Sequence, residues 1–212
     1  MTRDWREWHQ QYEQSGSALQ RRLAAVQRGI RAALGARPPG KIRVISMCAG
    51  DGRDLLGVLA DHPRAGDVVG RLVELDPALA AAARRAAPPE IEVSCGDASV
   101  SDAYAGAVPA DLLLVCGVLG NMSDADVERT VRALSSLCSR GATVIWTRHR
   151  RPPDLTVSIR RWFGESGFDE LEFVAPADSL YSVGMHRLAG APRPWSRGER
   201  WFTFVANAEP NT

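Results

Sequence analysis

The clearest chemical pattern lies in the segment 47–54, with sequence MCAGDGRD, between an apolar run of strand length and a helical pattern. Glycines at 50 and 52 allow a tight turn and let a ligand approach where a Cβ would collide. A dinucleotide-binding turn would have a third glycine where Leu55 stands, so the nicotinamide or flavin fingerprint is incomplete. The segment therefore predicts a ligand-binding turn, with a plain connector as the alternative.

Acidic residues stand at the ends of the next two predicted strands. Glu74 comes 22 positions after Gly52, where doubly wound folds hold ribose hydroxyls. Asp97, within the sequence CGDA at 95–98, would suit an adenine amino group. A second glycine-rich strand end, VCGVLGN, occupies 115–121. Because ligands in such sheets lie outside the carboxyl ends of the strands, we expect the four segments to converge on one site.

An alternation of strand and helix patterns positions these segments. Nearly continuous apolar strands between helices are typical of a parallel sheet buried on both faces, and predict a doubly wound α/β fold. Late apolar segments without long crossovers predict at least one antiparallel pair. Strands are expected near 42–47, 68–75, 91–95, 111–116 and 142–147, and two or three more among 168–174, 181–188 and 201–205. Helices are expected near 53–61, 77–87, 99–105, 124–138 and 155–166.

An N-terminal helical arm is expected over residues 1–40, ahead of a core domain over 41–212 that begins at Ile42. Apolar residues recur at spacings of three and four from Leu19 to Leu34, and Ser17 with Gln20 has the form of a capping box. Before that helix, three aromatic residues share helical spacing: Trp5, Trp8 and Tyr12.

The composition is that of a globular protein, with 45% hydrophobic and 24% charged residues among 212. No run approaches the roughly 18 apolar residues of a membrane span, and the first residues do not resemble a secretory signal, so we expect a cytoplasmic protein without a membrane partner. A net charge of +1 without a basic tail gives no support to a nucleic-acid partner. The four cysteines stand singly and indicate small buried hydrophobes, and no metal site is predicted.

In order and spacing, these motifs resemble those of the class I S-adenosylmethionine-dependent methyltransferases over about residues 42–188. CAGDGRD at 48–54 is similar to the first motif of that family, Glu74 takes the position of its ribose acid, and CGDA at 95–98 is similar to its adenine-contacting motif. The resemblance implies a mostly parallel seven-stranded sheet with the last strand inserted antiparallel. It also implies S-adenosylmethionine (SAM) as cofactor and S-adenosylhomocysteine (SAH) as product.

The chain departs from the family pattern at Ser46 and Cys48, where an Asp and a Gly are frequent, so Asp51 or Asp54 could contact the methionine amino group instead. Arg21 or Arg22 could reach the methionine carboxylate through charge-assisted bonds. The aromatic arm is either a lid over the cofactor or simple packing. The cofactor-binding residues are expected to be Cys48, Ala49, Gly50, Asp51, Gly52, Asp54, Glu74, Leu75, Asp97, Ala98, Cys116, Gly117, Tyr12 and Arg22.

His149 and Asn121 are the candidate catalytic residues. His149 follows the fifth strand, at the rim where an acceptor would bind, and a histidine ordinarily titrates near neutrality, as suits a general base; a solvated basic loop is the alternative. Asn121 is expected either to hold the acceptor or the methionine amino group, or only to shape its turn. Its neighbours lack the Asn/Asp-Pro-Pro-aromatic motif of methyltransferases that act on nucleic-acid bases, which favours a small-molecule acceptor.

The predicted function is transfer of a methyl group from SAM to an oxygen, nitrogen or carbon of a small molecule by direct in-line displacement. The sulfonium already makes the methyl group electrophilic, so the protein mainly aligns the reactants and excludes water. One alternative is a SAM-binding regulatory protein without transferase activity. A less favoured one is a nicotinamide-dependent oxidoreductase. The oligomeric state and the acceptor stay open.

Overall fold

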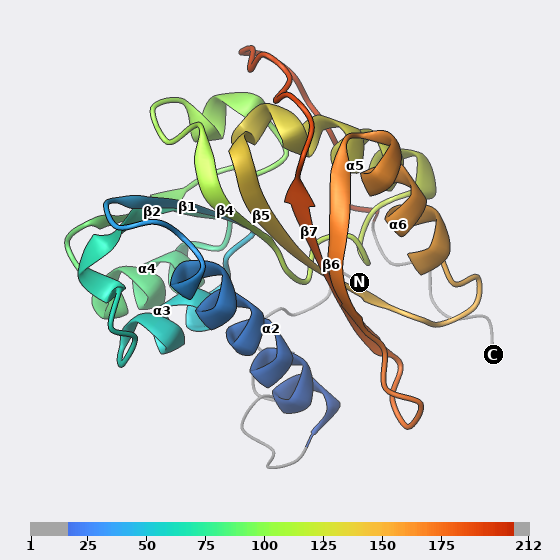
Figure 1. The fold of residues 1–212 in the computed structure, drawn as a ribbon, viewed down its shortest axis with the longest axis horizontal. Helices are drawn as coiled ribbons and strands as arrows, with labels where there is room; N and C mark the ends of the chain where they lie inside the picture. Colours follow the sequence, from blue (N-terminus) through green and yellow to red (C-terminus); the bar gives the residue numbers. More distant parts are fainter. Residues whose placement is uncertain (1–16, 206–212) are drawn as a thin grey trace.

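The computed structural model describes residues 17–205, which form one seven-stranded sheet covered by helices (Figure 1). The strands are β1 Ile42–Met47, β2 Val68–Glu74, β3 Ile91–Cys95, β4 Ala110–Val115, β5 Cys138–His149, β6 Phe168–Val174 and β7 Tyr181–Leu188. Their order is β3-β2-β1-β4-β5-β7-β6. Strands β1 to β5 are parallel, and β7 pairs antiparallel with both β5 and β6. The predicted mostly parallel sheet with an inserted antiparallel strand is confirmed.

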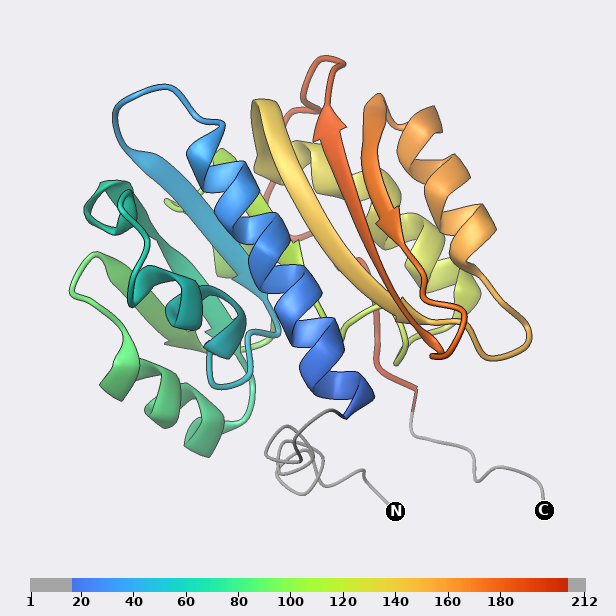
Figure 2. The same ribbon diagram turned by 60° about the horizontal axis from the view of Figure 1, so that its bottom comes forward.

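Helices cover both faces of this sheet. Helices α2, α3 and α4 lie on one face, whereas α5 and α6 lie on the other (Figure 2). The α-helices are α2 Ala18–Gly35, α3 Arg53–Leu59, α4 Pro77–Ala86, α5 Asp124–Ala133 and α6 Thr156–Glu165.

Local sequence explains several helix starts. The Ser17 hydroxyl accepts a hydrogen bond from the Gln20 amide at 3.1 Å at the start of α2. Asp76 accepts hydrogen bonds from two amides in the first turn of α4, and Pro77 is the first residue of that helix. A side-chain acceptor before the helix satisfies amides that have no partner within it, and proline fits the first position because its missing amide is not needed there.

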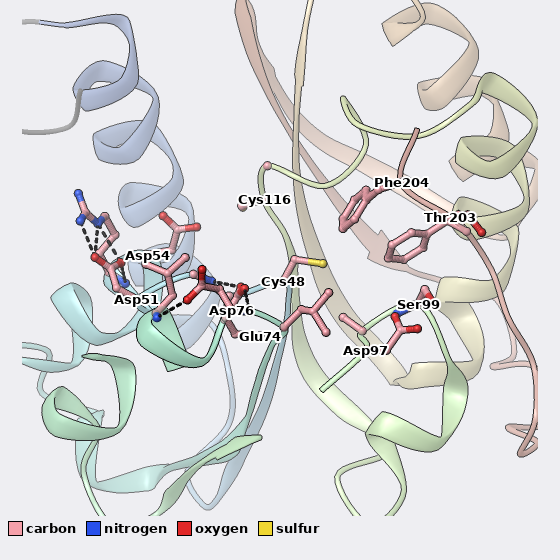
Figure 3. A pocket seen from close by; sticks show the side chains of 18 of the residues that line it. Cys48, Asp51, Asp54, Glu74, Asp76, Asp97, Ser99, Cys116, Thr203 and Phe204 are labelled. Atoms are coloured by element: carbon pink, nitrogen blue, oxygen red, sulfur yellow. Dashed lines mark hydrogen bonds and ion pairs between the residues drawn. The ribbon is translucent and has the colours of Figure 1, made fainter. Parts of the chain in front are cut away.

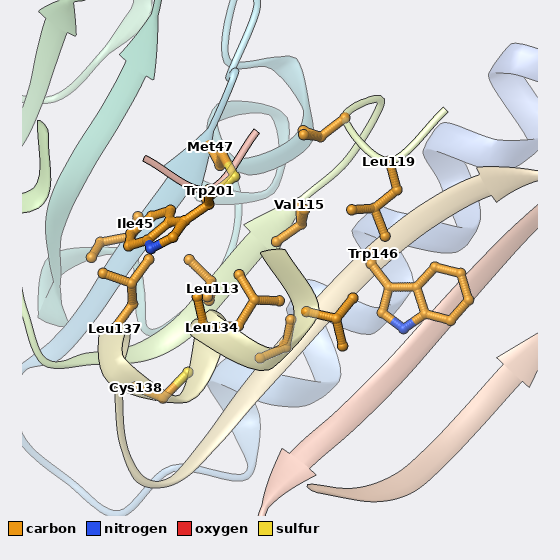
Figure 4. Close-up of a cluster of buried hydrophobic side chains, with 14 of the residues drawn as sticks. Ile45, Met47, Leu113, Val115, Leu119, Leu134, Leu137, Cys138, Trp146 and Trp201 are labelled. Atoms are coloured by element: carbon orange, nitrogen blue, oxygen red, sulfur yellow. The ribbon is translucent and has the colours of Figure 1, made fainter. Parts of the chain in front are cut away.

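Each face of the sheet has its own apolar core. On one face, Val26 and Ile30 of α2 pack in the same buried cluster as Ile42 of β1. The core therefore begins within α2, and the expectation that it begins at Ile42 is wrong, because the apolar stripe of α2 is long enough to cover the sheet. On the other face, buried side chains surround Trp146 of β5 and Trp201 (Figure 4).

The segment 201–205 does not form the predicted strand. It lies on the α5 side of the sheet and makes one isolated bridge, between Phe204 and Met122, while Arg200 just before it makes another with Val100. Trp201 and Phe202 are both buried and residues 203–205 are exposed, which differs from the alternating burial of a strand with one covered face. The two buried side chains pack into the core, and the segment does not pair beside β6, the edge strand.

Two predicted helices are shorter or tighter than expected. The helix expected at 99–105 is a single 3-10 segment, Ser101–Tyr104. The helix expected at 124–138 ends at Ala133, continues as the 3-10 segment Leu134–Leu137 and leads directly into β5. The cause is that apolar residues three apart suit both helix types, so spacing does not separate them.

Of the arm predicted over residues 1–40, the structure describes Ser17 onward. Trp5, Trp8 and Tyr12 lie outside the described residues. Between residues 17 and 205, no helix combines the length and apolar character needed to cross a membrane.

Candidate active site

A cavity of about 550 Å³ opens at the carboxyl ends of strands β1 to β4. Figure 3 shows acids from the first two strand ends on one side of it and Asp97, Thr203 and Phe204 on the other. Among the residues predicted to bind cofactor, Gly52 does not line the cavity, and Tyr12 lies outside the described residues. The remaining twelve all line it: Arg22, Cys48, Ala49, Gly50, Asp51, Asp54, Glu74, Leu75, Asp97, Ala98, Cys116 and Gly117.

The turn after β1 has a left-handed backbone at three positions: Cys48, Gly50 and Gly52, with φ of 51°, 60° and 77°. Cys48 is the one non-glycine residue with positive φ between residues 17 and 205, at a position where the resembling family often has glycine. A Cβ on Gly52 would lie 2.7 Å from Leu56 Cδ1 and 2.9 Å from Leu72 Cδ1. Gly52 therefore permits the turn and its packing on the core, while Gly50 forms the cavity wall.

Glu74 ends β2 and is fixed by two backbone amides. The Gly50 amide donates to Oε2 at 2.7 Å, and the Asp76 amide donates to Oε1 at 2.9 Å. The side chain is 9% exposed and lines the cavity. One carboxylate thus joins the turn after β1 to the end of β2. Because a carboxylate oxygen accepts two hydrogen bonds, each oxygen keeps capacity for a ligand hydroxyl.

Asp97 follows β3 and is held from two sides. The Ser99 amide donates to Oδ1 at 2.9 Å, and Arg200 Nη1 donates to Oδ2 at 2.9 Å. Partial burial opposes ionisation, but the hydrogen bonds from Ser99 and the Arg200 guanidinium hold the pKa of Asp97 below its usual value. Asp97 is therefore ionised at neutral pH and presents an acceptor to the cavity.

The opposite end of the cavity contains Arg22 and Asp54. Burial raises the pKa of Asp54, and the Arg22 cation opposes this effect. Arg22 lines the cavity, whereas Arg21 forms an ion pair with Asp178, 2.6 Å long, and does not line it. Asp51 receives hydrogen bonds from Arg53 on both oxygens. Of the alternatives that the sequence left open, the geometry favours Arg22, which lines the cavity where Arg21 does not, and Asp54, because Asp51 is held by Arg53.

The thiols of Cys48 and Cys116 also line the cavity. Burial raises the pKa of both thiols, and the neighbouring carboxylates Glu74 and Asp54 add to the effect. Both thiols are therefore protonated at neutral pH. The expectation that all four cysteines are buried holds for Cys138 alone. Cys48 and Cys116 are partly buried because they line the cavity, and Cys95 is exposed because it ends β3 at the edge of the sheet.

The two candidate catalytic residues lie beside the cavity and not in its wall. The Asn121 amide donates to the Gly117 carbonyl at 2.7 Å, so this side chain shapes the turn after β4. His149 ends β5, is exposed, and its imidazole lies against Gly120 of the same turn, where a Cβ would meet it at 3.3 Å. The structure thus brings both residues to one loop cluster. Their catalytic roles stay predictions.

Sequence reasoning missed two groups of wall residues. Neighbours of predicted residues are Arg53, Asp76, Leu79 and Ser99, and the late segment adds Arg200, Phe202, Thr203 and Phe204. The late group comes from the segment assigned to a terminal strand and from Arg200 just before it. A signal was present in the Pro/Gly-rich stretch 190–198, because such a linker lets the chain leave the sheet and return to its other end.

Comparisons with known proteins agree with this architecture. No protein-family model and no curated protein matches the sequence. The chain is similar to an O-methyltransferase family protein from Burkholderia thailandensis, with 16% identity and a TM-score of 0.61 over 82% of this chain and 57% of that one. It is similar to magnesium protoporphyrin IX methyltransferase from Synechocystis with bound SAH, with 13% identity and a TM-score of 0.62 over 86% and 93% of the two chains. The third is N-methyltransferase NodS from Bradyrhizobium japonicum, with 15% identity and a TM-score of 0.59 over 81% and 96%.

The chain thus spans little more than half of the first of these proteins and nearly all of the other two. At such identities the likeness concerns architecture, and it agrees with the strand order and the inserted antiparallel strand. This chain has the fold of the class I SAM-dependent methyltransferases.

Proposed function

We propose that this protein binds SAM and transfers its methyl group to a small-molecule acceptor. The observation that carries the proposal is the cavity at the ends of β1 to β4, with Glu74 and Asp97 fixed as acceptors in its wall. In the proposal, Glu74 accepts ribose hydroxyls and Asp97 accepts the adenine amino group. Arg22 binds the methionine carboxylate, and Asp54 binds the methionine amino group.

The cavity residues fit such a ligand. The volume of about 550 Å³ lies within the roughly 300–1,000 Å³ that small-molecule pockets occupy. Asp97 lies on one side of the cavity and Asp54 on the other (Figure 3), as a ligand with a purine at one end and an amino acid at the other requires. The left-handed backbone at Gly50 brings a main-chain surface without a side chain into the wall between them.

When bound, SAM supplies an electrophilic methyl group on a positively charged sulfur. The chain's own residues then have three tasks: to bind both ends of the cofactor, to orient an acceptor and to exclude water. Because the thiols of Cys48 and Cys116 stay protonated, they do not compete with the acceptor as nucleophiles. No nucleophilic side chain is required for a direct displacement.

The acceptor site belongs, in this proposal, to the loop cluster of Asn121 and His149. These residues lie after β4 and β5, next to the cavity wall at Cys116 and Gly117. His149 is proposed as general base for an acceptor that must lose a proton, and Asn121 positions the turn against which the acceptor lies. Structural neighbours include proteins named as O- and N-methyltransferases, so the fold serves more than one acceptor atom.

The experiment has a binding part and a turnover part. Calorimetry with SAM, SAH and NADH should show binding of the first two and none of the third; the reverse result would favour the oxidoreductase alternative. Release of SAH in the presence of a metabolite library should then identify the acceptor class. Cofactor binding with no turnover on any library member would favour the regulatory alternative. The expected cytoplasmic location stays a prediction.

A further inference from the structure

The segment Glu199–Val205, the C-terminal strap, forms one wall of the cavity although it follows the last strand of the sheet. We propose that the strap is part of the adenine subsite, with Arg200 as a positioning residue for Asp97 and Phe204 as a ring surface for the base. The inference rests on the function proposed above. It assigns the strap a role in choosing the nucleoside base.

The strap is firmly attached across this side of the cavity. Trp201 is 2% exposed and stacks on Tyr104, with ring centroids 5.7 Å apart. Backbone hydrogen bonds join the strap to the segment after β3 at one end and to the turn after β4 at the other. They are Ser101 N to Glu199 O at 2.9 Å, Trp201 N to Ser99 O at 2.9 Å, and Val205 N to Asn121 O at 3.0 Å.

Arg200 connects the strap to the adenine-side acid. Its Nη1 donates to Asp97 Oδ2 at 2.9 Å and also to the Ser99 hydroxyl. The two charged side chains are 55% and 43% exposed, and ion pairs this exposed add little to folding stability. The role of the ion pair is therefore its effect on the Asp97 carboxylate, which Arg200 keeps charged and in one orientation. Such a carboxylate accepts from a 6-amino group and repels a 6-oxo group.

Phe204 supplies a partly exposed ring on the same wall. The residue is 37% exposed, and its ring centroid lies 5.1 Å from that of Phe202, which is buried. In Figure 3, Phe204 and Thr203 lie on the side of Asp97 and Ser99, across from Glu74. Every purine base has a π-face that can stack on an aromatic ring, so the ring of Phe204 suits a base whose amino group Asp97 binds.

The test compares two ligands that differ at one position of the base: SAH and its 6-oxo analogue, S-inosylhomocysteine. Calorimetry on the full chain should show that the wild type prefers SAH by about tenfold or more. The 6-oxo group of the analogue is a hydrogen-bond acceptor, and it would face the carboxylate of Asp97, which is also an acceptor. Arg200→Gln should weaken SAH about fivefold and change the affinity for the analogue less than about twofold. Arg200→Lys, which keeps the cation, should restore part of the preference.

Arg197→Gln is the matched control, since it removes the same charge from an exposed residue just before the strap that does not line the cavity. It should leave both affinities unchanged. Equal weakening of both ligands by Arg200→Gln would overturn the positioning role, as would unchanged affinities.

A second variant, Phe204→Leu, tests the ring independently and should weaken both ligands about fivefold. Unchanged affinity in this variant would overturn the assignment of Phe204. The two proposals fail in different ways: a wild type that binds neither ligand would overturn the proposed function. A wild type that binds SAH while Arg200→Gln and Phe204→Leu match it would overturn only the role of the strap.

Discussion

Glu74 has two tasks at once, because the same carboxylate fixes the turn after β1 and faces the cavity. Its oxygens accept from the Gly50 and Asp76 amides, so removing it leaves two amides without their side-chain acceptor. A ligand-binding acid and a structural acid usually occupy different positions. Here, the geometry of the turn after β1 depends on Glu74, the residue proposed to bind the cofactor.

Glu74→Ala should therefore weaken SAH binding by about 1–3 kcal/mol and lower the free energy of unfolding by about 1–3 kcal/mol. Calorimetry and urea unfolding measure the two effects separately. Glu92→Ala is a suitable control, since Glu92 is 60% exposed and forms a surface ion pair with Arg71, and it should change neither quantity appreciably. Normal SAH affinity in folded Glu74→Ala protein would refute the ribose assignment.

Residues at the cavity wall divide into those that sequence predicts and those that it does not. Glu74, Asp97 and Gly50 were predicted because each lies at or just after the carboxyl end of a strand, and parallel strands bring these ends to one edge. Arg200 was not, since its contact with Asp97 joins residues 103 positions apart and no periodicity marks it. Gly52 was predicted for ligand approach, but its missing Cβ makes room for Leu56 and Leu72.

At the scale of elements, the antiparallel strand β7 is packed most tightly where Gly184 faces Trp146 of β5. A Cβ on Gly184 would lie 2.2 to 2.5 Å from indole atoms of Trp146, which is fully buried and stacked on Phe163. Gly164, near the end of α6, has nothing within 4 Å of its Cβ position. A side chain at position 184 would therefore clash, whereas one at position 164 would meet open space.

Gly184→Ala should lower the free energy of unfolding by about 2–4 kcal/mol, because the indole has no room to move. Gly164→Ala should instead raise it by about 0.5–1 kcal/mol, since alanine is the better helix former. Denaturant unfolding of both variants checks the contrast. Equal effects of the two substitutions would mean that the indole of Trp146 can move to accept a Cβ at position 184.

His186 of β7 makes stability depend on pH. Burial lowers the pKa of His186 to about 4, although the nearby Glu170 carboxylate opposes the shift. The neutral ring accepts from Trp146 Nε1 at 3.2 Å and stacks on Phe163 with centroids 4.3 Å apart. The folded state therefore excludes a proton that the unfolded state binds below about pH 6.5.

The stability contributed by neutral His186 is present above about pH 6.5 and is lost as the pH falls toward 4, by about 2–3 kcal/mol in all. Urea unfolding at several pH values should show this decrease, and His186→Gln should flatten it between pH 6.5 and 4, while its Oε1 can still accept from Trp146. An unchanged pH dependence in His186→Gln would assign the decrease to other groups.

Element types were predicted better than element ends or partners. The five parallel strands and the pair β6 and β7 were found because apolar runs of strand length stand between helical patterns. The segment 201–205 is also apolar and of strand length, but it makes only an isolated bridge, from Phe204 to Met122, and no strand of the sheet pairs with it. The pairing of such a segment depends on tertiary contacts across the whole chain and cannot be read from its local sequence.

At the scale of the whole molecule, the cavity and the antiparallel strand share one cooperative structure. Strands β1 and β4 contribute side chains to both cores, with Val44 and Leu112 on one face and Ile45 and Leu113 on the other. Trp146 and Trp201 lie in the same core, so β5 and the strap are connected through packed side chains. We therefore expect the cavity and the distant β7 to unfold together.

SAH at about 100 times its dissociation constant should raise the free energy of unfolding by about 2.7 kcal/mol and the melting temperature by several degrees. The same gain should appear in Gly184→Ala protein, whose defect lies outside the cavity wall, because a cooperative unit is stabilised as a whole. Calorimetric melting and circular dichroism should show one coincident transition with and without SAH. Two transitions, of which SAH shifts only one, would show that β1 to β4 and the β5-β7-β6 part unfold separately; the ligand would then leave the Gly184→Ala defect unrelieved.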